Sequence, residues 1–199
     1  MTIRRLNVGD FEQMYNMVAS HDTHQGLPRS ASFLGTEADL NDMWRTYHSE
    51  AITLDNFYYF GEVDNKGIIH AFIQYEMWVE NGVNVVSSGS HISNKTVDLS
   101  RSYGQSVWYD CFIDISNYAV TFFDNLGITT FYAIYRGALA DKFVGLADVP
   151  QTLLYQNYNI ELAEYVNAGK FSTNREFFVY VLKSRRTTAQ RIMRLVKKS

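Results

Sequence analysis

Arg101, Gly104 and Ser106 stand in a short polar stretch directly ahead of the longest helical pattern of the chain. A helix N-terminus exposes unpaired N–H groups and carries about half a positive charge, so it can bind phosphate. Gly104 would let the backbone approach a diphosphate closely, Arg101 would add a cation, and Gln105 follows the turn. The stretch therefore predicts a diphosphate-binding turn, and the alternative is a glycine-containing loop that simply starts a helix.

His21, Asp22 and His24 form a second group of side chains that could do chemistry, because all three can ligate metals. A structural zinc site needs four ligands, however, and no further Cys/His group with metal spacing accompanies them. We interpret the stretch as a polar loop between helices and predict no metal site. Cys111, the single cysteine, lies on the apolar face of the expected helix, where it is expected to be a small buried hydrophobic residue.

The helix behind the glycine turn is expected to span about Gln105 to Leu126. Gly127 follows its last periodic residue, where a left-handed cap favours glycine. A β-rich strand without polar alternation, Thr129–Tyr135, comes next and indicates an inner strand of a sheet. The apolar residues of the helix recur at helical spacing and are Trp108, Cys111, Phe112, Ile115, Ala119, Phe122 and Leu126.

The remaining elements follow from the same patterns. Asp10 is a natural N-cap for the first helix, and Asp64 to Gly67 has hairpin chemistry. The predicted order is strand, two helices, three antiparallel strands, helix, strand, helix and two strands. The strand patterns cover 2–6, 57–63, 68–78, 83–92, 160–166 and 176–183, and the other helix patterns cover 10–18, 36–51 and 137–155.

Length and composition indicate one domain. The chain has 199 residues, of which 46% are apolar and 15% aromatic, enough for a substantial core. No apolar run of about 18 residues exists, which predicts no membrane span, and the N-terminus has no signal-peptide pattern. One cysteine cannot form an intramolecular disulfide, so a cytoplasmic protein is expected.

A basic tail follows this domain. Seven basic residues and no acidic ones lie between Lys183 and Lys198. Removing these seven from the 18 basic residues leaves 11 against 21 acidic ones. Thr187 is predicted to begin a final helix with Ile192 and Val196 on its apolar stripe. We therefore divide the chain into a domain over 1–183 and a basic C-terminal helix over 184–199, which either docks on the acidic body or faces an anionic partner such as nucleic acid or an acidic protein.

The element order and several motifs resemble the GCN5-related N-acetyltransferase (GNAT) family. Arg101-Ser-Tyr-Gly104-Gln-Ser106 is similar to the family's pyrophosphate-binding signature, and Tyr155-Gln-Asn-Tyr-Asn-Ile160 is similar to its Tyr-x-x-x-Gly-Phe segment. The resemblance covers roughly residues 2–183. It implies an α/β (α+β) fold: a mixed, mostly antiparallel twisted sheet with helices on both faces. The most useful observation on this resemblance is whether a V-shaped cleft opens between the fourth and fifth strands beside Gly104.

The function implied by this resemblance is acyl-CoA-dependent N-acyl transfer to an amine that the sequence does not identify. Acetyl-CoA is the expected acyl donor, held by Arg101, Gly104, Gln105 and Ser106. Acyl transfer to an amine needs a base for the ammonium and an acid for the departing thiolate. Tyr155 is the candidate acid, and Glu76 and His91 are the candidate bases. Each tyrosine also has a packing role as its alternative, since the chain contains 14 of them.

Two further functions remain open at this point. Ser106 and Asn159 depart from the small residues of the GNAT motifs, which favours a catalytically silent GNAT-like protein used for interaction or structure. The aromatic-rich style and loose signature also resemble GNAT-like proteins of tailed phages, acting in the host cytoplasm or the virion. The basic tail favours nucleic-acid association instead. An oligomer is compatible with all three.

Overall fold

The computed structural model describes residues 1–19, 23–24, 27–28, 45–46, 48–93, 107–136, 150–164 and 190–199. A 3₁₀ turn, η1 (Val8–Asp10), leads into helix α1 (Phe11–Ala19), and residues 45–46 and 48–51 are also helical. None of the described helices is long and apolar enough to cross a membrane. The other helices are α3 (Val107–Asn125) and α4 (Leu153–Asn157), and the strands are β1 (Thr2–Leu6), β2 (Thr23–His24), β3 (Leu27–Pro28), β4 (Phe57–Val63), β5 (Ile69–Glu80), β6 (Val83–Ser93), β7 (Thr130–Arg136), β8 (Tyr158–Glu164) and β9 (Gln190–Lys197).

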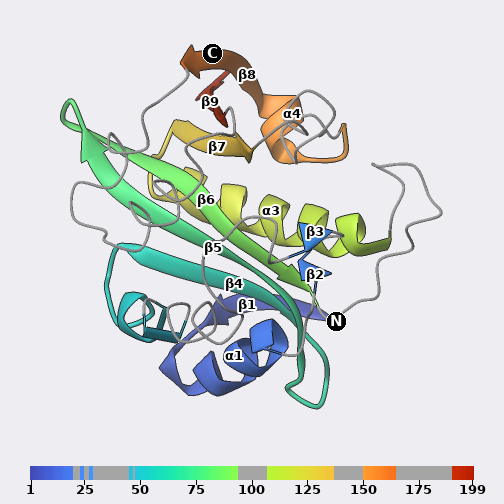
Figure 1. Ribbon diagram of the computed structural model, residues 1–199. Coiled ribbons are helices and arrows are strands. Elements are labelled where there is room, and N and C mark those ends of the chain that lie inside the picture. The colour runs from blue at the N-terminus through green and yellow to red at the C-terminus, as the bar shows by residue number, and fades with distance from the viewer. Residues whose placement is uncertain are drawn as a thin grey trace.

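Seven strands form one sheet in the order β1-β4-β5-β6-β7-β9-β8. Every neighbouring pair is antiparallel except β6 and β7, which run parallel (Figure 1). A parallel pair needs a crossover connection, and α3 supplies it. The predicted α/β fold, a mixed and mostly antiparallel sheet, is confirmed.

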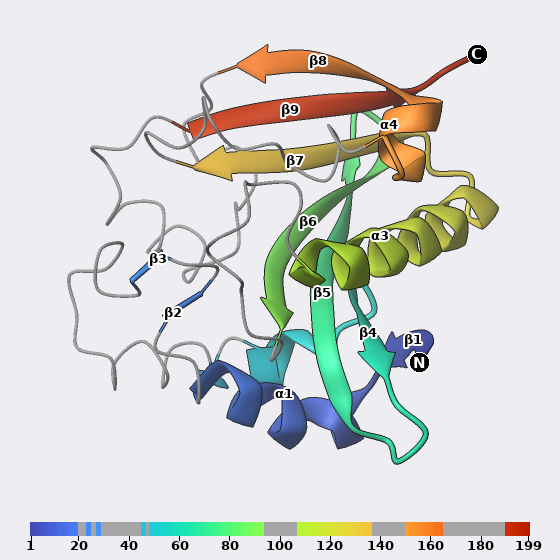
Figure 2. The ribbon, with the colours of Figure 1, turned by 90° about the vertical axis from the view of Figure 1, so that its right-hand side faces the viewer.

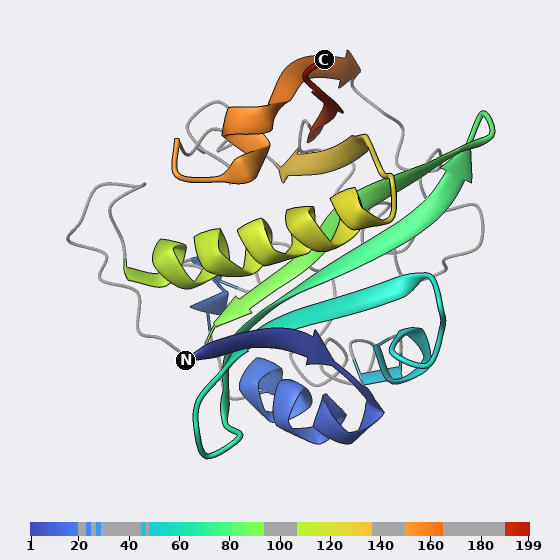
Figure 3. The same cartoon turned by 180° about the vertical axis from the view of Figure 1, so that it is seen from behind.

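The sheet carries a separate hydrophobic core on each face. Successive residues of β4 alternate between them: Tyr58 and Phe60 pack with α3, whereas Phe57 and Tyr59 pack with α1. This alternation follows from the period of two in a strand. Helix α1 therefore covers one face, and α3 with the short α4 covers the other (Figures 1 and 3).

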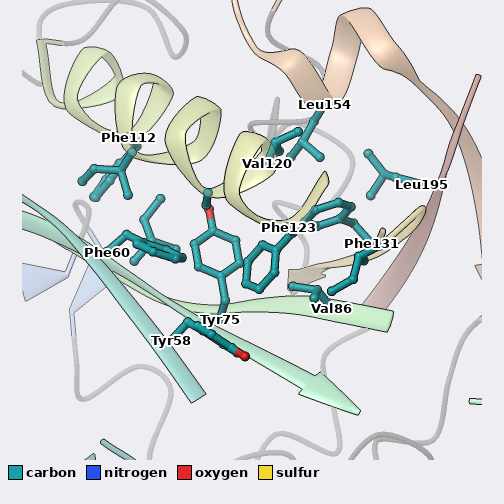
Figure 4. Close-up of a cluster of buried hydrophobic side chains, with 14 of the residues drawn as sticks. Tyr58, Phe60, Tyr75, Val86, Phe112, Val120, Phe123, Phe131, Leu154 and Leu195 are labelled. Atoms are coloured by element: carbon teal, nitrogen blue, oxygen red, sulfur yellow. The ribbon is translucent and has the colours of Figure 1, made fainter. Parts of the chain in front are cut away.

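The core under α3 is dominated by aromatic rings (Figure 4). Phe123 is fully buried, and its ring centroid lies 5.6 Å from that of Tyr75 and 5.8 Å from that of Phe131. These two partners belong to β5 and β7. One side chain of α3 thus joins strands that lie on either side of β6.

Helix α3 ends with a Schellman cap. The Gly127 N–H donates to the Asp124 carbonyl, the Ile128 N–H donates to the Phe123 carbonyl, and Gly127 has a φ of +76°. The predicted stop at Gly127 is confirmed. The predicted apolar face is partly wrong: Leu126 is 52% exposed and Phe123, not Phe122, is fully buried, because the sheet meets a face turned by one residue.

Helix α1 begins at Phe11, as the predicted cap at Asp10 implied, but the 3₁₀ turn η1 precedes it and moves the cap to Asn7. The N-cap is Asn7, whose side chain accepts from the Gly9 N–H, and Asp10 accepts from the Asn7 N–H to complete a capping box. Asp10 also binds both terminal nitrogens of Arg4, at 2.8 and 2.7 Å. Its pKa lies below the ordinary value, chiefly because of the Arg4 hydrogen bond.

The predicted basic C-terminal helix over 184–199 is wrong where the structure describes this segment. Residues 190–197 form strand β9, which pairs antiparallel with β7 on one side and β8 on the other (Figure 2). Leu195 is fully buried in the core under α3. Hydrogen bonds to strands on both sides favour the strand over the predicted helix. The apolar residues also suit a strand, because Ile192 and Val196 are β-branched.

The cations of this segment favour the strand for a second reason. Basic residues three or four apart repel each other on a helix, whereas in β9 they meet opposite charges. Arg194 stands opposite Glu161 in the β8–β9 register, and the Lys197 ammonium lies 2.9 Å from Asp124. The Lys198 ammonium donates to the Gln156 carbonyl at 2.7 Å. The strand predicted at 176–183 and residues 137–149 of the predicted fourth helix lie outside the described residues.

Candidate functional site

Strands β6 and β7 part almost as soon as they meet. Their register contains two pairs, Val86 with Phe131 and Ser87 with Tyr132. Beyond these pairs β6 continues to Ser93 and β7 to Arg136, and neither finds a further partner in the other (Figure 2). The fourth and fifth long strands of the sheet therefore diverge, which is the feature that the sequence left open.

An irregularity in β6 lies just beyond this point of divergence. Ile73 of β5 pairs with His91, but Tyr75 pairs with Ser88, so β6 has one residue more than β5 between the two pairs. Such a bulge leaves backbone groups outside the ladder and turns the strand. Because buried backbone N–H and C=O groups need partners, the diverging edges are suited to an extended ligand that carries amides of its own.

The N-terminus of α3 lies at the open end of the diverging pair. Only the Gly127 cap separates the end of α3 from the start of β7, so the helix and the strand run in opposite directions. The first residue of α3, Val107, is therefore at the end where β7 finishes, as the ribbon shows (Figures 1 and 2). Helix N–H groups at this end favour an anion. Arg101, Gly104, Gln105 and Ser106, the predicted phosphate ligands, lie outside the described residues.

Glu76, a candidate base, lies one strand away from the point of divergence. It stands directly opposite Ser87 on β6, and Ser87 stands directly opposite Tyr132 on β7, so the three share one face of the sheet. This face is the one opposite α3, because the neighbouring Tyr75 belongs to the α3 core. Glu76 is 9% exposed. A carboxylate in such a place can take a proton from a group bound between the strands.

His91, the second candidate base, occupies a different register position. Its backbone lies opposite Ile73, beyond the irregularity of β6. Its side chain is outside the described part of the structure. The register therefore places Glu76, and not His91, beside the last β6–β7 pair.

Tyr155, the candidate acid, lies on α4. Thr152 caps this helix through its hydroxyl, which accepts from the Tyr155 N–H, and the Asn117 amide oxygen of α3 accepts from the Leu153 N–H at 2.7 Å. The backbone is thus fixed on the α3 side, while the Tyr155 side chain is 46% exposed. The structure does not bring Tyr155 and Glu76 into contact, since they lie on opposite faces of the sheet. An acid and a base on opposite faces suit a reacting centre held between the diverging strands.

Sequence reasoning missed a polar cluster beside Glu76. The Tyr132 hydroxyl donates to Glu80 at 2.5 Å, and the Trp78 ring stacks on the Tyr132 ring with 5.7 Å between centroids. Burial, followed by the Glu80 hydrogen bond, raises the pKa of Tyr132 to about 12, so the phenol remains a donor. Trp78 and Glu80 are two residues apart on one strand, and this spacing predicts that their side chains share a face of the sheet. Their partner could not be found, because the β6–β7 register depends on how α3 crosses the sheet.

Only one member of the possible metal group of the sequence lies in the described part of the structure. Within the ranges that the structure describes, no three His, Cys, Asp or Glu side chains come together as a metal site would require. His24 lies in β2, whereas His21 and Asp22 fall outside those ranges.

Comparison with solved structures agrees with this geometry. The chain matches an aminoglycoside 6′-acetyltransferase of type Ii, at 10% identity and a TM-score of 0.52, over 98% of this chain and 97% of that one. It matches an acetyltransferase of the GNAT family from Streptococcus pneumoniae at 12% identity and a TM-score of 0.51, covering 98% and 99% of the two chains. The chain has the GNAT fold.

A third GNAT-fold match is a chimera of the spermidine N-acetyltransferase SpeG from Vibrio cholerae with hSSAT. Its identity is 12% and its TM-score 0.52, over 98% of this chain and 94% of that one. No protein-family model matches the sequence, and no curated protein matches it. At such identities the likeness to GNAT structures establishes the fold, and the function must be argued from the site.

Proposed function

We propose that this GNAT-fold chain is an acyl-CoA-dependent N-acyltransferase that acts on an amine. The observation that carries the proposal is the early divergence of β6 and β7, with a bulge in β6 and the N-terminus of α3 at the open end. Acetyl-CoA fits this arrangement, since it has two amides in an extended arm and a diphosphate beyond them. The amides suit the free backbone edges, and the diphosphate suits the helix N-terminus.

The proposed chemistry assigns one proton transfer to each face of the sheet. The bound thioester supplies an activated acyl group. Glu76 accepts the proton of the acceptor ammonium, directly or through water, so that the amine can form the new N–C bond. Backbone N–H groups at the bulge of β6 stabilise the negative charge on the carbonyl oxygen. The Tyr155 phenol donates a proton to the sulfur as the C–S bond breaks, and the second proton that the nitrogen loses on becoming an amide returns to the phenolate through solvent.

The acceptor is proposed only as a class. Two of the matched proteins are named for spermidine and aminoglycosides, which both carry primary amines. Small polyamines, aminoglycosides and a lysine-containing peptide therefore form the first panel to test. Nucleic acid as a partner of the C-terminal segment loses support, because Lys197 and Lys198 are engaged with Asp124 and the end of α4.

Calorimetry with acetyl-CoA tests the proposal. Binding at micromolar to high-micromolar concentration is expected. Gly104→Asp should abolish it, because the new carboxylate would stand where the diphosphate is expected and repel it. Gly67→Asp is the matched control: it adds the same charge at another glycine turn, between β4 and β5, and should leave binding unchanged. Absence of binding to the wild-type protein at high micromolar concentration would refute the enzyme reading and leave an interaction module.

A further inference from the structure

The β5–β6 hairpin extends well beyond the strand that supports it. Strand β4 makes its last pair with β5 between Phe57 and Glu76, and Asn56 adds two hydrogen bonds to the Met77 backbone. Residues 78–85, here called the hairpin arm, have each other as their only strand partners among the described residues, through a turn in which Asn81 and Gly82 both have positive φ (Figure 3). The described neighbours thus give the arm no ladder support of its own.

Side chains join the arm to the other half of the sheet. Glu80 accepts from the Tyr132 hydroxyl at 2.5 Å, and the Trp78 ring lies over the Tyr132 ring at an interplanar angle of 20°. Arg194 stands directly opposite Tyr132 on β9 and interacts with the same phenol. We call Trp78, Glu80, Tyr132 and Arg194 the apex clamp. It connects the arm, β7 and β9 on the face opposite α3.

The apex clamp lies where it can fix the angle between β6 and β7. Tyr132 is itself a member of the last β6–β7 pair, with Ser87. The two strands share only two pairs, and parallel pairs are slightly weaker per residue than antiparallel ones. On the α3 face, Val86 and Phe131 pack under Phe123. On the opposite face, the clamp joins β5 to β7 across β6, because Trp78 and Glu80 pair with Val85 and Val83 of β6 and contact Tyr132 of β7.

We propose that the apex clamp is a positioning device that sets the divergence of β6 and β7 and thereby the shape of the acyl-CoA site. The inference rests on the proposed function. The clamp residues do not touch the reacting atoms; they act through the backbones of β6 and β7. A loosened clamp weakens donor binding, because the extended part of the bound acyl-CoA must then hold β6 and β7 in position by itself. It leaves the proton transfers by Glu76 and Tyr155 unchanged once the donor is bound.

The chain offers a matched control for this proposal. Tyr158 on β8 also donates its phenol to a carboxylate, that of Asp124 at 2.7 Å, and β8 also pairs with β9. Tyr132→Phe and Tyr158→Phe therefore remove the same group from the same kind of bond. Tyr158 packs against Phe131 on the α3 face, but its hydroxyl is bonded to α3, whereas the Tyr132 hydroxyl is bonded to β5 across the β6–β7 pair.

Two measurements on the full chain test the clamp. Tyr132→Phe and Glu80→Gln should each speed hydrogen exchange in the segments 83–93 and 130–136, and the double variant should add little to either single one. Each should raise the calorimetric Kd for acetyl-CoA by about five- to tenfold, the size of a modest coupling between sites. The kcat at saturating donor should stay within about twofold of wild type. Tyr158→Phe should leave the Kd for acetyl-CoA unchanged, and any faster exchange it causes should extend over the whole sheet instead of being confined to 83–93 and 130–136.

Each contrary result has a distinct meaning. Unchanged exchange in both clamp variants, or the same change in Tyr158→Phe, overturns the clamp even if acetyl-CoA binds. Raised exchange with an unchanged Kd shows that the strands loosen without consequence for the donor, and it overturns the positioning role. If the wild-type protein itself fails to bind acetyl-CoA, the proposed function is refuted and the positioning role falls with it.

Discussion

Asp124 offers a sharp test of how the C-terminal strand is held. Its carboxylate lies in the last turn of α3, accepts from the Tyr158 hydroxyl at 2.7 Å and meets the Lys197 ammonium at 2.9 Å. It therefore joins α3 to β8 and β9 in one place. The two replacements Asp124→Ala and Asp124→Asn separate the contributions of the hydrogen bond and the charge.

The expected free energies follow from the surroundings of each group. Tyr158 is 2% exposed, so loss of its acceptor in Asp124→Ala costs about 1–3 kcal/mol. The Lys197 side chain is 39% exposed, which limits the ion pair to about 0.5 kcal/mol. Removing a negative charge near a helix C-terminus regains about 0.3–1 kcal/mol, and alanine regains about 0.5 kcal/mol of helix propensity. Asp124→Ala should therefore lose roughly 1–2 kcal/mol, whereas Asp124→Asn should stay within about 0.5 kcal/mol of wild type.

Urea denaturation at pH 7 measures both differences, and the melting temperature of Asp124→Ala should fall by about 2–6 °C for a chain of this size. Combining Asp124→Ala with Tyr158→Phe should cost less than the sum of the two single changes, since both break one bond. Equal destabilisation by Asn and Ala would refute the reasoning, because the charge and not the hydrogen bond would then dominate. No effect from either would show that β9 is held without this contact.

Three further predictions follow from other parts of the chain. Asp10→Asn should destabilise the protein by about 1 kcal/mol at pH 7. Because the pKa of Asp10 is depressed in the folded state, its stabilising contribution is complete above the unfolded pKa near 4 and is lost as the pH falls through the folded pKa. Denaturation at pH 7 and at pH 2.5 should therefore show the difference between variant and wild type fading at the lower pH. Gly127→Ala should cost about 1–2 kcal/mol in urea denaturation, because an alanine at a φ of +76° is strained, whereas an unchanged midpoint would contradict the cap. Glu76→Gln and Tyr155→Phe should each lower kcat on the order of 10²-fold with little change in acetyl-CoA affinity, and an unchanged rate would remove that residue from the mechanism.

Most of the fold could be predicted from the sequence, because its strong patterns are local. Helix α3 and its Gly127 stop depend on apolar periodicity and one backbone conformation, and both were predicted correctly. Strand β4 matches its predicted bounds, 57–63, because a β-rich run ends at a hairpin turn. In contrast, Gln190–Lys197 has an apolar pattern that suits a helix and a strand alike. Its state is decided by β7 and β8, to which no local signal points.

The candidate site shows the same division. Glu76 could be selected as a carboxylate on an inner strand, and the structure places it beside the last β6–β7 pair. Its neighbours Ser87 and Tyr132 could not be selected, because they meet only through a register set by the α3 crossover. The assignments of Glu76, His91 and Tyr155 to catalysis, and of 101–106 to phosphate binding, remain predictions.

The place of β9 in the sheet affects how the chain can fold during synthesis. Strands β1, β4, β5, β6 and β7 are all made before residue 137, and they can pair among themselves as the chain emerges. Strand β8 is made next, but its described partner is β9 alone. Until residues 190–197 leave the ribosome, β7 lacks the partner on its second edge and β8 lacks the strand that joins it to the described sheet. This interval exposes an unpaired strand edge to other nascent chains, and it is the stage at which a chaperone would be of most use.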